Sequence, residues 1–418
     1  MHHTVTPTRR HVLQAAAAGV AVLATGCASI GAATRPRVVV VGGGWGGLGA
    51  VRSLIEGGKA DVTLIEPNEG FMSCPMSALY IAGFKPVSYL QRSYQNVDQK
   101  GVKRVRERVL EIDRAKSQVV TATQRLTYDF LVLSLGVEYM EEGIQGYAEA
   151  RAQLPVGFRA FEQMAVRQQA DEFLVKGGQF VISVPKPPYR CPPAPYERAF
   201  LIAEQMQKRA TKGKIIILDA NAAPTPASTT KAILNAMQQY SGQIEYVPSS
   251  EIRSVDMGKR SLQTSAGEVG FQHANLVLPM RAPGLIRQAG LGERWAAIKL
   301  PSFQSVADDR IYVIGDAQGS PLPKSGHVAF NAGKQVAEEI LERLAGKTMT
   351  APTAVVDLPT GICWAKVTEK EAININVSSS IAPGEAAKLK FTVDEVHNAR
   401  SGAGAASWAD GMWTAMLG

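Results

Sequence analysis

The sequence predicts an α/β protein with two Rossmann-like dinucleotide-binding domains and a small C-terminal α+β domain. Three observations indicate this fold class. A glycine-rich turn follows the apolar strand "VVVV", a second strand–helix–strand unit begins at "GGQFVISV", and β-type alternation returns in the last part of the chain. Alternating strands and helices build parallel sheets. With 418 residues, 45% of them hydrophobic, the chain is long enough for two or three domains.

Residues 1–34 have the pattern of an export signal. Arg9 and Arg10 precede an apolar stretch of about a dozen residues, too short to span a bilayer. The pair predicts export to the periplasm by the twin-arginine route, and a chance pair before a general secretory signal is the alternative. "LATGC" resembles a lipoprotein cleavage box that would lipidate Cys27, whereas "GAAT" offers a second cleavage site. Membrane anchoring through Cys27 therefore stays open.

Charge and cysteine content narrow the functional classes. Lys and Arg number 45 against 37 Asp and Glu, which gives a mild net charge of +8. No basic run with interleaved aromatics suggests a nucleic-acid partner, and we expect no metal site. Once Cys27 is removed, Cys74, Cys191 and Cys363 remain. An oxidising compartment favours one disulfide and leaves one thiol to be explained.

The first domain, expected over residues 35–150, begins with a dinucleotide motif. Gly42, Gly44 and Gly47 form G-x-G-x-x-G directly after a strand, with Gly43 inside the turn. Glu66 closes the next strand, where an acid that binds ribose belongs. The glycines allow the backbone to approach a pyrophosphate, which the following helix N-terminus stabilises.

Two later segments indicate that the dinucleotide is FAD, with residues 271–345 as the second part of its domain. One apolar strand ends at Gly136, and "RIYVIGDAQG" ends at Gly315 and Asp316. The second pattern resembles the flavin-binding motif of the two-dinucleotide-domain, glutathione-reductase-like flavoproteins, in which the aspartate contacts the ribityl and pyrophosphate region. A helix N-cap is the alternative role of this aspartate. Lys324 and Gly326 precede and open a helix whose N-terminus can face the flavin.

The second α/β unit, expected over residues 151–270, has lost its phosphate-binding turn. In the superfamily this unit binds NAD(P)H, but here the turn reads "PKPPYRCPPAPYE". Proline lacks an N–H, so this turn cannot present a row of amides to a pyrophosphate. A nicotinamide site is therefore not expected. Residues 346–418 are expected to form the α+β domain, which in the superfamily makes an interface or docks a partner.

The chain resembles the flavoprotein subunit of flavocytochrome c sulfide dehydrogenase. The resemblance rests on "VVVVGGGWGGLGAVRSL", "VTLIEPNEGFMSCPMS", "PPYRCPPAPYERA", "IYVIGDAQGSPLPKSGHVAFNAGK", "TGICWAKV" and "SWADGMWTAM". It implies FAD attached covalently to Cys74 and a redox-active disulfide between Cys191 and Cys363. A purely structural disulfide is the alternative. The resemblance further implies Glu197 as acid/base and an aromatic residue near the flavin, either Trp408 or Trp413.

The function implied is oxidation of sulfide to sulfur or polysulfide through the disulfide and FAD. The chain has no C-x-x-C-H and so carries no attached haem; the expected acceptor is a separate c-type cytochrome subunit in a heterodimer. A sulfide:quinone reductase, which would have a membrane-binding C-terminus, is the first alternative. A catalytically inactive flavin-binding assembly subunit is the second. An NAD(P)H-dependent persulfide or disulfide reductase is disfavoured by the missing second glycine motif.

Overall fold

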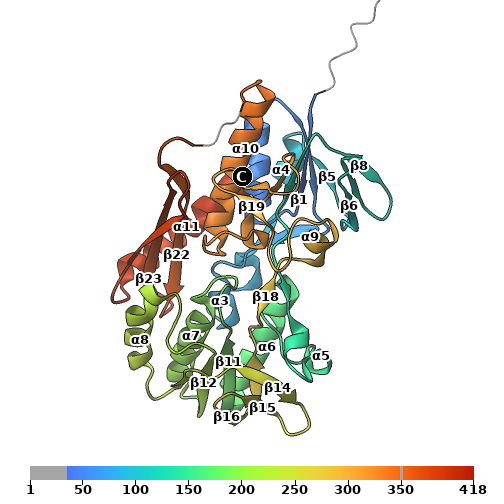
Figure 1. The fold of residues 1–418 in the computed structure, drawn as a ribbon. Coiled ribbons are helices and arrows are strands. Elements are labelled where there is room, and N and C mark those ends of the chain that lie inside the picture. The colour runs from blue at the N-terminus through green and yellow to red at the C-terminus, as the bar shows by residue number, and fades with distance from the viewer. Residues whose placement is uncertain (1–34, 349–351) are drawn as a thin grey trace, which may run out of the picture. The chain divides into compact units, whose positions relative to one another are not determined.

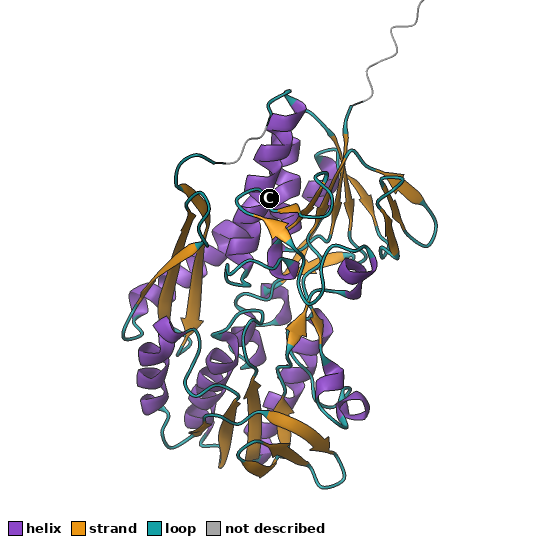
Figure 2. Ribbon diagram, in the orientation of Figure 1, coloured by secondary structure: helices purple, strands orange, loops and turns teal. Residues whose placement is uncertain are grey.

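The computed structural model describes residues 35–348 and 352–418 (Figure 1), so the predicted export signal lies outside the described residues. Helices and strands alternate through two α/β units, and an antiparallel sheet with a final helix follows (Figure 2). The predicted fold class is confirmed. Among the described residues, no helix combines the length and apolar character needed to cross a membrane.

The first α/β unit is built on a seven-stranded sheet in the order β19-β20-β21-β9-β1-β2-β5. The strands from β21 to β5 are parallel, and β19 and β20 are antiparallel at one edge. β21 lies beside β9 although nearly the whole second unit separates them in sequence, so this sheet is built from two separate parts of the chain. The strands are β1 (Arg37–Val41), β2 (Asp61–Ile65), β5 (Lys103–Val105), β9 (Phe130–Leu133), β19 (Ile298–Lys299), β20 (Gln304–Ser305) and β21 (Ile311–Val313).

Two long helices, α2 (Trp45–Gly57) and α10 (Gly326–Leu344), pack against each other in this unit. A Cβ atom added at Gly333 would lie 2.2 Å from the Gly46 carbonyl oxygen, so the small residues allow the two backbones to approach closely. Both helices begin at the carboxyl edge of the sheet. Their N-termini, which favour anions, therefore lie at the edge where α/β proteins bind ligands.

Shorter elements complete the first unit. They are β3 (Gly70–Met72) with β4 (Gln91–Ser93), the meander of β6 (Glu111–Asp113), β7 (Gln118–Val120) and β8 (Arg125–Thr127), and the helices α3 (Ser77–Ile81), α4 (Gln95–Gln99) and α9 (Gly284–Gln288). An antiparallel ladder of β10 (Glu138–Tyr139) with β18 (Met280–Arg281) joins the chain segments that leave and re-enter this unit.

The second α/β unit has a four-stranded parallel sheet in the order β13-β12-β11-β17. β17 pairs with β11, so this unit extends past the expected boundary at residue 270, because its sheet is complete only with residues 273–275. Its strands are β11 (Gly178–Val184), β12 (Gly213–Asp219), β13 (Ile244–Val247) and β17 (His273–Asn275), with a meander of β14 (Ile252–Asp256), β15 (Ser261–Thr264) and β16 (Gly267–Gly270). Its helices are α5 (Tyr147–Ala150), α6 (Ala160–Lys176), α7 (Ala194–Arg209) and α8 (Thr230–Gln239).

The C-terminal part consists of an antiparallel sheet of β22 (Val356–Lys366), β23 (Ala372–Ile381) and β24 (Lys388–Val393), followed by α11 (Ala399–Leu417). β22 contacts α10 of the first unit and α7 of the second (Figure 1). Strand β22 therefore brings its side chains to the place where the two α/β units meet.

Candidate functional site

Three cysteines from distant segments line one small cavity of about 50 Å³. Cys74 comes from the loop after β3, Cys191 from the turn between β11 and α7, and Cys363 from β22. All three are free thiols in this structure, so the expected Cys191–Cys363 disulfide is not formed in it. The same cavity is lined by further polar and aromatic side chains: Glu197, Arg198, Ser325, His327, Trp364 and Trp408.

The proline-rich turn holds Cys191 in an unusual backbone conformation. Its φ of 79° lies in the left-handed region, which non-glycine residues seldom adopt. The Cys191 N–H donates to the Lys324 carbonyl oxygen at 3.0 Å, and the neighbouring Arg190 Nε donates to Asp316 Oδ2 at 2.6 Å. Both bonds tie the turn to the second predicted flavin motif. Such backbone strain is common at functional sites.

Cys363 is positioned by the contact of β22 with the start of α10. The Ile362 N–H donates to His327 Nδ1 at 2.9 Å. A Cβ atom added at Gly361 would lie 2.7 Å from a methyl carbon of Val328, so the glycine permits this close approach. Cys363 therefore lies beside the helix N-terminus that is expected to face the flavin.

The first glycine motif fits the pyrophosphate of FAD. Gly42 has a φ of 100°, and a Cβ atom there would lie 2.3 Å from the Ser134 carbonyl oxygen, so only glycine is compatible with this turn. Gly44 precedes α2 without a side-chain cap, and a Cβ atom on it would meet no atom within 4 Å. The space beside Gly44 therefore leaves room for an anion at the N-terminus of α2.

Glu66 lies beside this turn. Its carboxylate accepts hydrogen bonds from the Gly43 N–H at 2.7 Å and from the Asn68 N–H at 2.8 Å. The carboxylate thus orders the turn, and a contact with ribose stays a prediction. Gly47 lies inside α2 at its contact with the turn, since its Cβ would come within 1.8 Å of the Gly42 carbonyl oxygen.

The second predicted flavin motif follows β21, which β9 separates from β1 in the same sheet. Gly315 and Asp316 lie in a short 3-10 turn directly after β21. Lys324 Nζ donates to the carbonyl oxygens of Asp316 at 2.7 Å and Gln318 at 2.9 Å. Burial lowers the pKa of Lys324 to about 8. The motif therefore carries a buried amine whose proton is held less tightly than that of a surface lysine.

Aromatic side chains connect the N-termini of α2 and α10 with α11. The rings of Trp45 and Trp408 stack with centroids 5.6 Å apart, and a Cβ atom added at Gly326 would lie 2.8 Å from the Trp45 ring. Trp408 lines the cysteine cavity. Trp413 packs instead against Tyr89, at a centroid distance of 5.3 Å. Of the two aromatic candidates, Trp408 is the one that the structure brings to the cysteines.

Gly136, the remaining predicted flavin residue, lies after β9 with a φ of 70°, and a Cβ atom on it would lie 2.6 Å from Arg190 Nη2. Its backbone thus gives the Arg190 side chain the room to reach Asp316. The predicted flavin residues that follow β1, β2, β9 and β21 therefore lie at the carboxyl edge of the first sheet.

Burial dominates the electrostatics of the cavity. It raises the pKa of Cys191 well above its ordinary value and that of Cys363 to about 11, and the Ser325 hydroxyl partly offsets the effect on Cys363. Burial also raises the pKa of Glu197 to about 7, against a smaller lowering by the Lys366 N–H, which donates to Glu197 Oε1 at 3.1 Å. A carboxyl with a pKa near neutrality can both accept and release a proton.

Sequence reasoning missed Arg190, Arg198, Ser325 and His327. Arg190 and Arg198 both lie within the segment "PPYRCPPAPYERA", Arg190 in the proline-rich turn and Arg198 in the first turns of α7. Both arginines could have been identified from the sequence, because each directly adjoins a predicted site residue, Cys191 or Glu197. The contacts of Ser325 and His327 with β22 depend on tertiary packing, for which the sequence gives no pattern.

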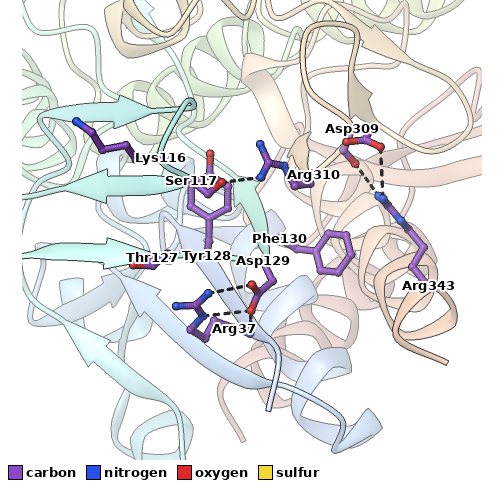
Figure 3. A pocket seen from close by; sticks show the side chains of 10 residues that line it. All are labelled: Arg37, Lys116, Ser117, Thr127, Tyr128, Asp129, Phe130, Asp309, Arg310 and Arg343. Carbon is purple, nitrogen blue, oxygen red and sulfur yellow. Dashed lines mark hydrogen bonds and ion pairs between the residues drawn. The ribbon is translucent and has the colours of Figure 1, made fainter. Parts of the chain in front are cut away.

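A second, open cavity of about 550 Å³ lies at the amino ends of β1, β9 and β21, the opposite edge of the sheet (Figure 3). Its arginines face carboxylates or hydroxyls: Arg37 Nη2 donates to Asp129 Oδ1 at 2.9 Å, and Arg310 Nη1 donates to the Ser117 hydroxyl at 2.6 Å. The other cations of the lining also have carboxylate partners: Lys116 pairs with Asp113, Arg310 with Asp308 and Arg343 with Asp309. These ion pairs weaken the attraction of the cavity for an anion. The cavity lined by the three cysteines is therefore the candidate functional site.

Comparisons with known proteins agree with this geometry. The family model "Pyridine nucleotide-disulphide oxidoreductase" matches residues 36–181, so this part of the chain is similar to the flavoproteins of that superfamily. A second family model, "Sulfide dehydrogenase [flavocytochrome c] flavoprotein chain, central", matches residues 164–279, the segment that contains the Cys191 turn. The predicted resemblance is thereby confirmed.

Individual proteins are also similar to this chain. A mitochondrial sulfide:quinone oxidoreductase from Mus musculus is 24% identical over 304 residues, covering 69% of this chain and 67% of its own. The crystal structure of the sulfide:quinone oxidoreductase from Aquifex aeolicus has a TM-score of 0.76 at 17% identity and covers 91% of both chains. An NAD-dependent persulfide reductase from A. fulgidus has a TM-score of 0.63 at 17% identity, covering 91% of this chain and 76% of its own. At these identities the two structures show a shared fold.

Proposed function

We propose that the chain oxidises sulfide to sulfur or polysulfide through a Cys191–Cys363 disulfide and FAD, and that a c-type cytochrome subunit accepts the electrons. The convergence of three cysteines and a buried carboxyl on one cavity carries this proposal. A single water needs roughly 10–15 Å³, so a cavity of about 50 Å³ suits a small inorganic sulfur species. The match of the central segment to the flavocytochrome c family supports the same substrate.

The chemical step proceeds on the chain's own sulfur atoms. Hydrosulfide attacks Cys191 of the disulfide, an S–S bond forms to the incoming sulfur, and the Cys191–Cys363 bond breaks. The incoming sulfur is oxidised, Cys363 leaves as the thiolate with the electron pair, and Glu197 takes the proton of the resulting persulfide. Cys363 is the better leaving group, since the Ser325 hydroxyl stabilises its thiolate. Bound FAD supplies the oxidising equivalent that regenerates the disulfide.

The packing of α11 favours a soluble electron acceptor over a membrane quinone. A membrane-binding C-terminus would present its apolar side chains to lipid. Here Met412, Trp413, Met416 and Leu417 are buried. The end of the helix is also held, because Arg52 and Lys100 donate to the Gly418 carbonyl oxygen at 2.8 Å and 2.7 Å. Sulfide:quinone reductase activity, which the named relatives suggest, remains the second candidate.

Two further parts belong to the proposal. Cys74 lines the cavity directly after β3, which supports it as the covalent attachment point of FAD. The twin-arginine sequence at Arg9 and Arg10 supports export to the periplasm with FAD already bound. An oxidising compartment would also favour the disulfide form of Cys191 and Cys363.

The acceptor assay separates the two candidates. Purified flavoprotein is mixed with sulfide and either a soluble c-type cytochrome or a short-chain ubiquinone analogue, and reduction of each acceptor is followed. We expect faster reduction of the cytochrome, with the quinone near the rate without protein. Faster reduction of the quinone would favour the second candidate, and an unreduced flavin under sulfide would refute the proposed function.

A further inference from the structure

Arg198 is a buried cation beside the three cysteines. It follows Glu197 on α7, lines the cavity and is only 1% exposed. Its guanidinium donates to the Val156 carbonyl oxygen at 2.9 Å, to Asn275 Oδ1 at 2.7 Å and to the Gly157 carbonyl oxygen at 2.6 Å. All three acceptors are neutral. The remaining contact is with the Phe158 ring, 4.7 Å from the guanidinium carbon, which is also neutral.

No carboxylate within the described ranges forms an ion pair with Arg198. Arg190, in the turn before α7, shows the usual arrangement, since its Nε lies 2.6 Å from Asp316 Oδ2. An unpaired buried charge costs several kcal/mol in a protein interior. A neutral amide side chain can make hydrogen bonds to carbonyl groups without the desolvation cost of a buried charge. A purely structural role in holding residues 156–157 therefore does not explain why this side chain is charged.

The titratable groups that interact electrostatically with Arg198 do not supply a permanent counter-charge. They are Cys74, Cys191, Tyr139 and Glu197, and each raises the pKa of Arg198 against a larger lowering by burial. Burial favours the neutral forms of all four groups. Near neutral pH, therefore, an anion bound in the cavity can act as the counter-ion of Arg198.

We propose that Arg198 binds the substrate as a small monoanion, hydrosulfide or the terminal anion of a short polysulfide, next to Cys191. This inference rests on the proposed function and deepens it, because it names the charge state of the substrate and the residue that selects it. Arg198 stabilises the anionic nucleophile in the cavity and afterwards the thiolate that the attack releases. Neutral molecules of the same size lack this interaction.

The test compares Arg198→Gln, which removes the charge, with Arg198→Lys, which keeps it. Arg209→Gln on the exposed end of α7 is the matched control. Flavin reduction by sulfide is followed by rapid mixing in the FAD-loaded chain, with thiocyanate as a non-reducing monoanion. A bulky aryl sulfonate of equal charge, too large for the cavity, controls for ionic strength.

We expect Arg198→Gln to raise the half-saturating sulfide concentration at least about tenfold and to weaken inhibition by thiocyanate by a similar factor, the loss of one charge-assisted interaction. The half-saturating sulfide concentration of Arg198→Lys should stay within about threefold of the wild-type value, and that of Arg209→Gln should equal the wild-type value. Unchanged half-saturation and inhibition in Arg198→Gln would overturn the inference. If Arg198→Gln does not bind FAD, the wild type alone provides the test. In that case, inhibition by thiocyanate no stronger than inhibition by the sulfonate would overturn the inference.

The failure of this inference can be told apart from the failure of the proposed function. If sulfide does not reduce the wild-type flavin, the proposed function is wrong. Calorimetric titration of thiocyanate into wild type and Arg198→Gln tests the anion site without turnover. Binding that is lost in the variant supports the site, and equal binding contradicts it.

Discussion

Glu197 and Arg198 are consecutive residues whose side chains are buried at the same cavity. A low-dielectric environment disfavours the charged form of a carboxyl, which is why the pKa of Glu197 rises to about 7. The arginine keeps its charge under the same conditions, since its intrinsic pKa is far higher. The pair thus combines a fixed positive charge with a carboxyl that can change its protonation near neutral pH.

The raised pKa of Glu197 predicts a pH-dependent stability. The ordinary value is 4.5 and the folded value is about 7, so the folded chain binds the proton more tightly than the unfolded chain. The stabilisation is fully present below pH 4.5 and is lost as the pH rises through 7. Relative to Glu197→Gln, wild type should lose about 3 kcal/mol of unfolding free energy over this range. Denaturant unfolding of both proteins at several pH values measures this loss. A difference in unfolding free energy between wild type and Glu197→Gln that does not change with pH would contradict the prediction.

A second residue-scale prediction concerns Cys74. If FAD is bound through this thiol, denatured wild-type protein should keep the yellow chromophore and a peptide containing Cys74 should carry it. Cys74→Ser should bind FAD but release it on denaturation, while Cys363→Ser retains it. Filtration of the denatured proteins and mass spectrometry of the peptides make the measurement. Release of all flavin from denatured wild type would show that no covalent bond exists.

At the scale of elements, α11 closes the C-terminal part onto the first unit. Trp413 is 3% exposed, and the Arg92 guanidinium carbon lies 4.1 Å from its ring centroid. A helix anchored in this way contributes to the core and cannot at the same time place these side chains in lipid. Its stability is therefore part of the stability of the whole chain.

Trp413→Ala should lower the free energy of unfolding by about 3–5 kcal/mol, because it removes a large buried ring. Gly411→Ala on the exposed side of the same helix is the control, since its Cβ would meet no atom within 4 Å, and it should be neutral or stabilising by up to about 1 kcal/mol. Chemical denaturation compares the three proteins. A loss below about 1 kcal/mol for Trp413→Ala would mean that α11 does not pack as described.

The N-terminus of α2 gives a further prediction at this scale. Gly44 has a φ of −78°, which alanine can adopt, and its Cβ would enter only open space. Gly44→Ala should therefore leave the stability of the flavin-free chain unchanged but reduce the affinity for FAD at least about tenfold, because the methyl group intrudes where the pyrophosphate approaches. Gly143→Ala, remote from the motif and equally open, is the control. Equal FAD affinity in all three proteins would contradict this placement of the pyrophosphate.

Local patterns predicted most of these elements. The strand–turn–helix around Gly42 and the strand before Gly315 were readable because apolar runs and glycines lie next to each other in sequence. The parallel partner of β11 at residues 273–275 was missed, since three residues carry no periodicity of their own. The hydrogen bond from Ile362 to His327 joins residues 35 positions apart, and no local rule anticipates it.

At the scale of the whole molecule, the site exists only where three parts of the chain meet. The first unit contributes Cys74 and the α10 N-terminus, the second contributes Cys191 with Glu197 and Arg198, and β22 contributes Cys363. The sequence could identify the three cysteines, but their convergence follows from the packing of β22 against α10 and α7.

The measurement that tests the central claim most directly is anaerobic flavin reduction by sulfide in wild type and Cys191→Ser. The serine variant keeps the FAD motifs but cannot form the disulfide. Wild-type flavin should be reduced rapidly, Cys191→Ser should be slower by at least about a thousandfold, and dithionite should reduce both equally. Reduction of Cys191→Ser by sulfide at the wild-type rate would contradict the role of the Cys191–Cys363 pair.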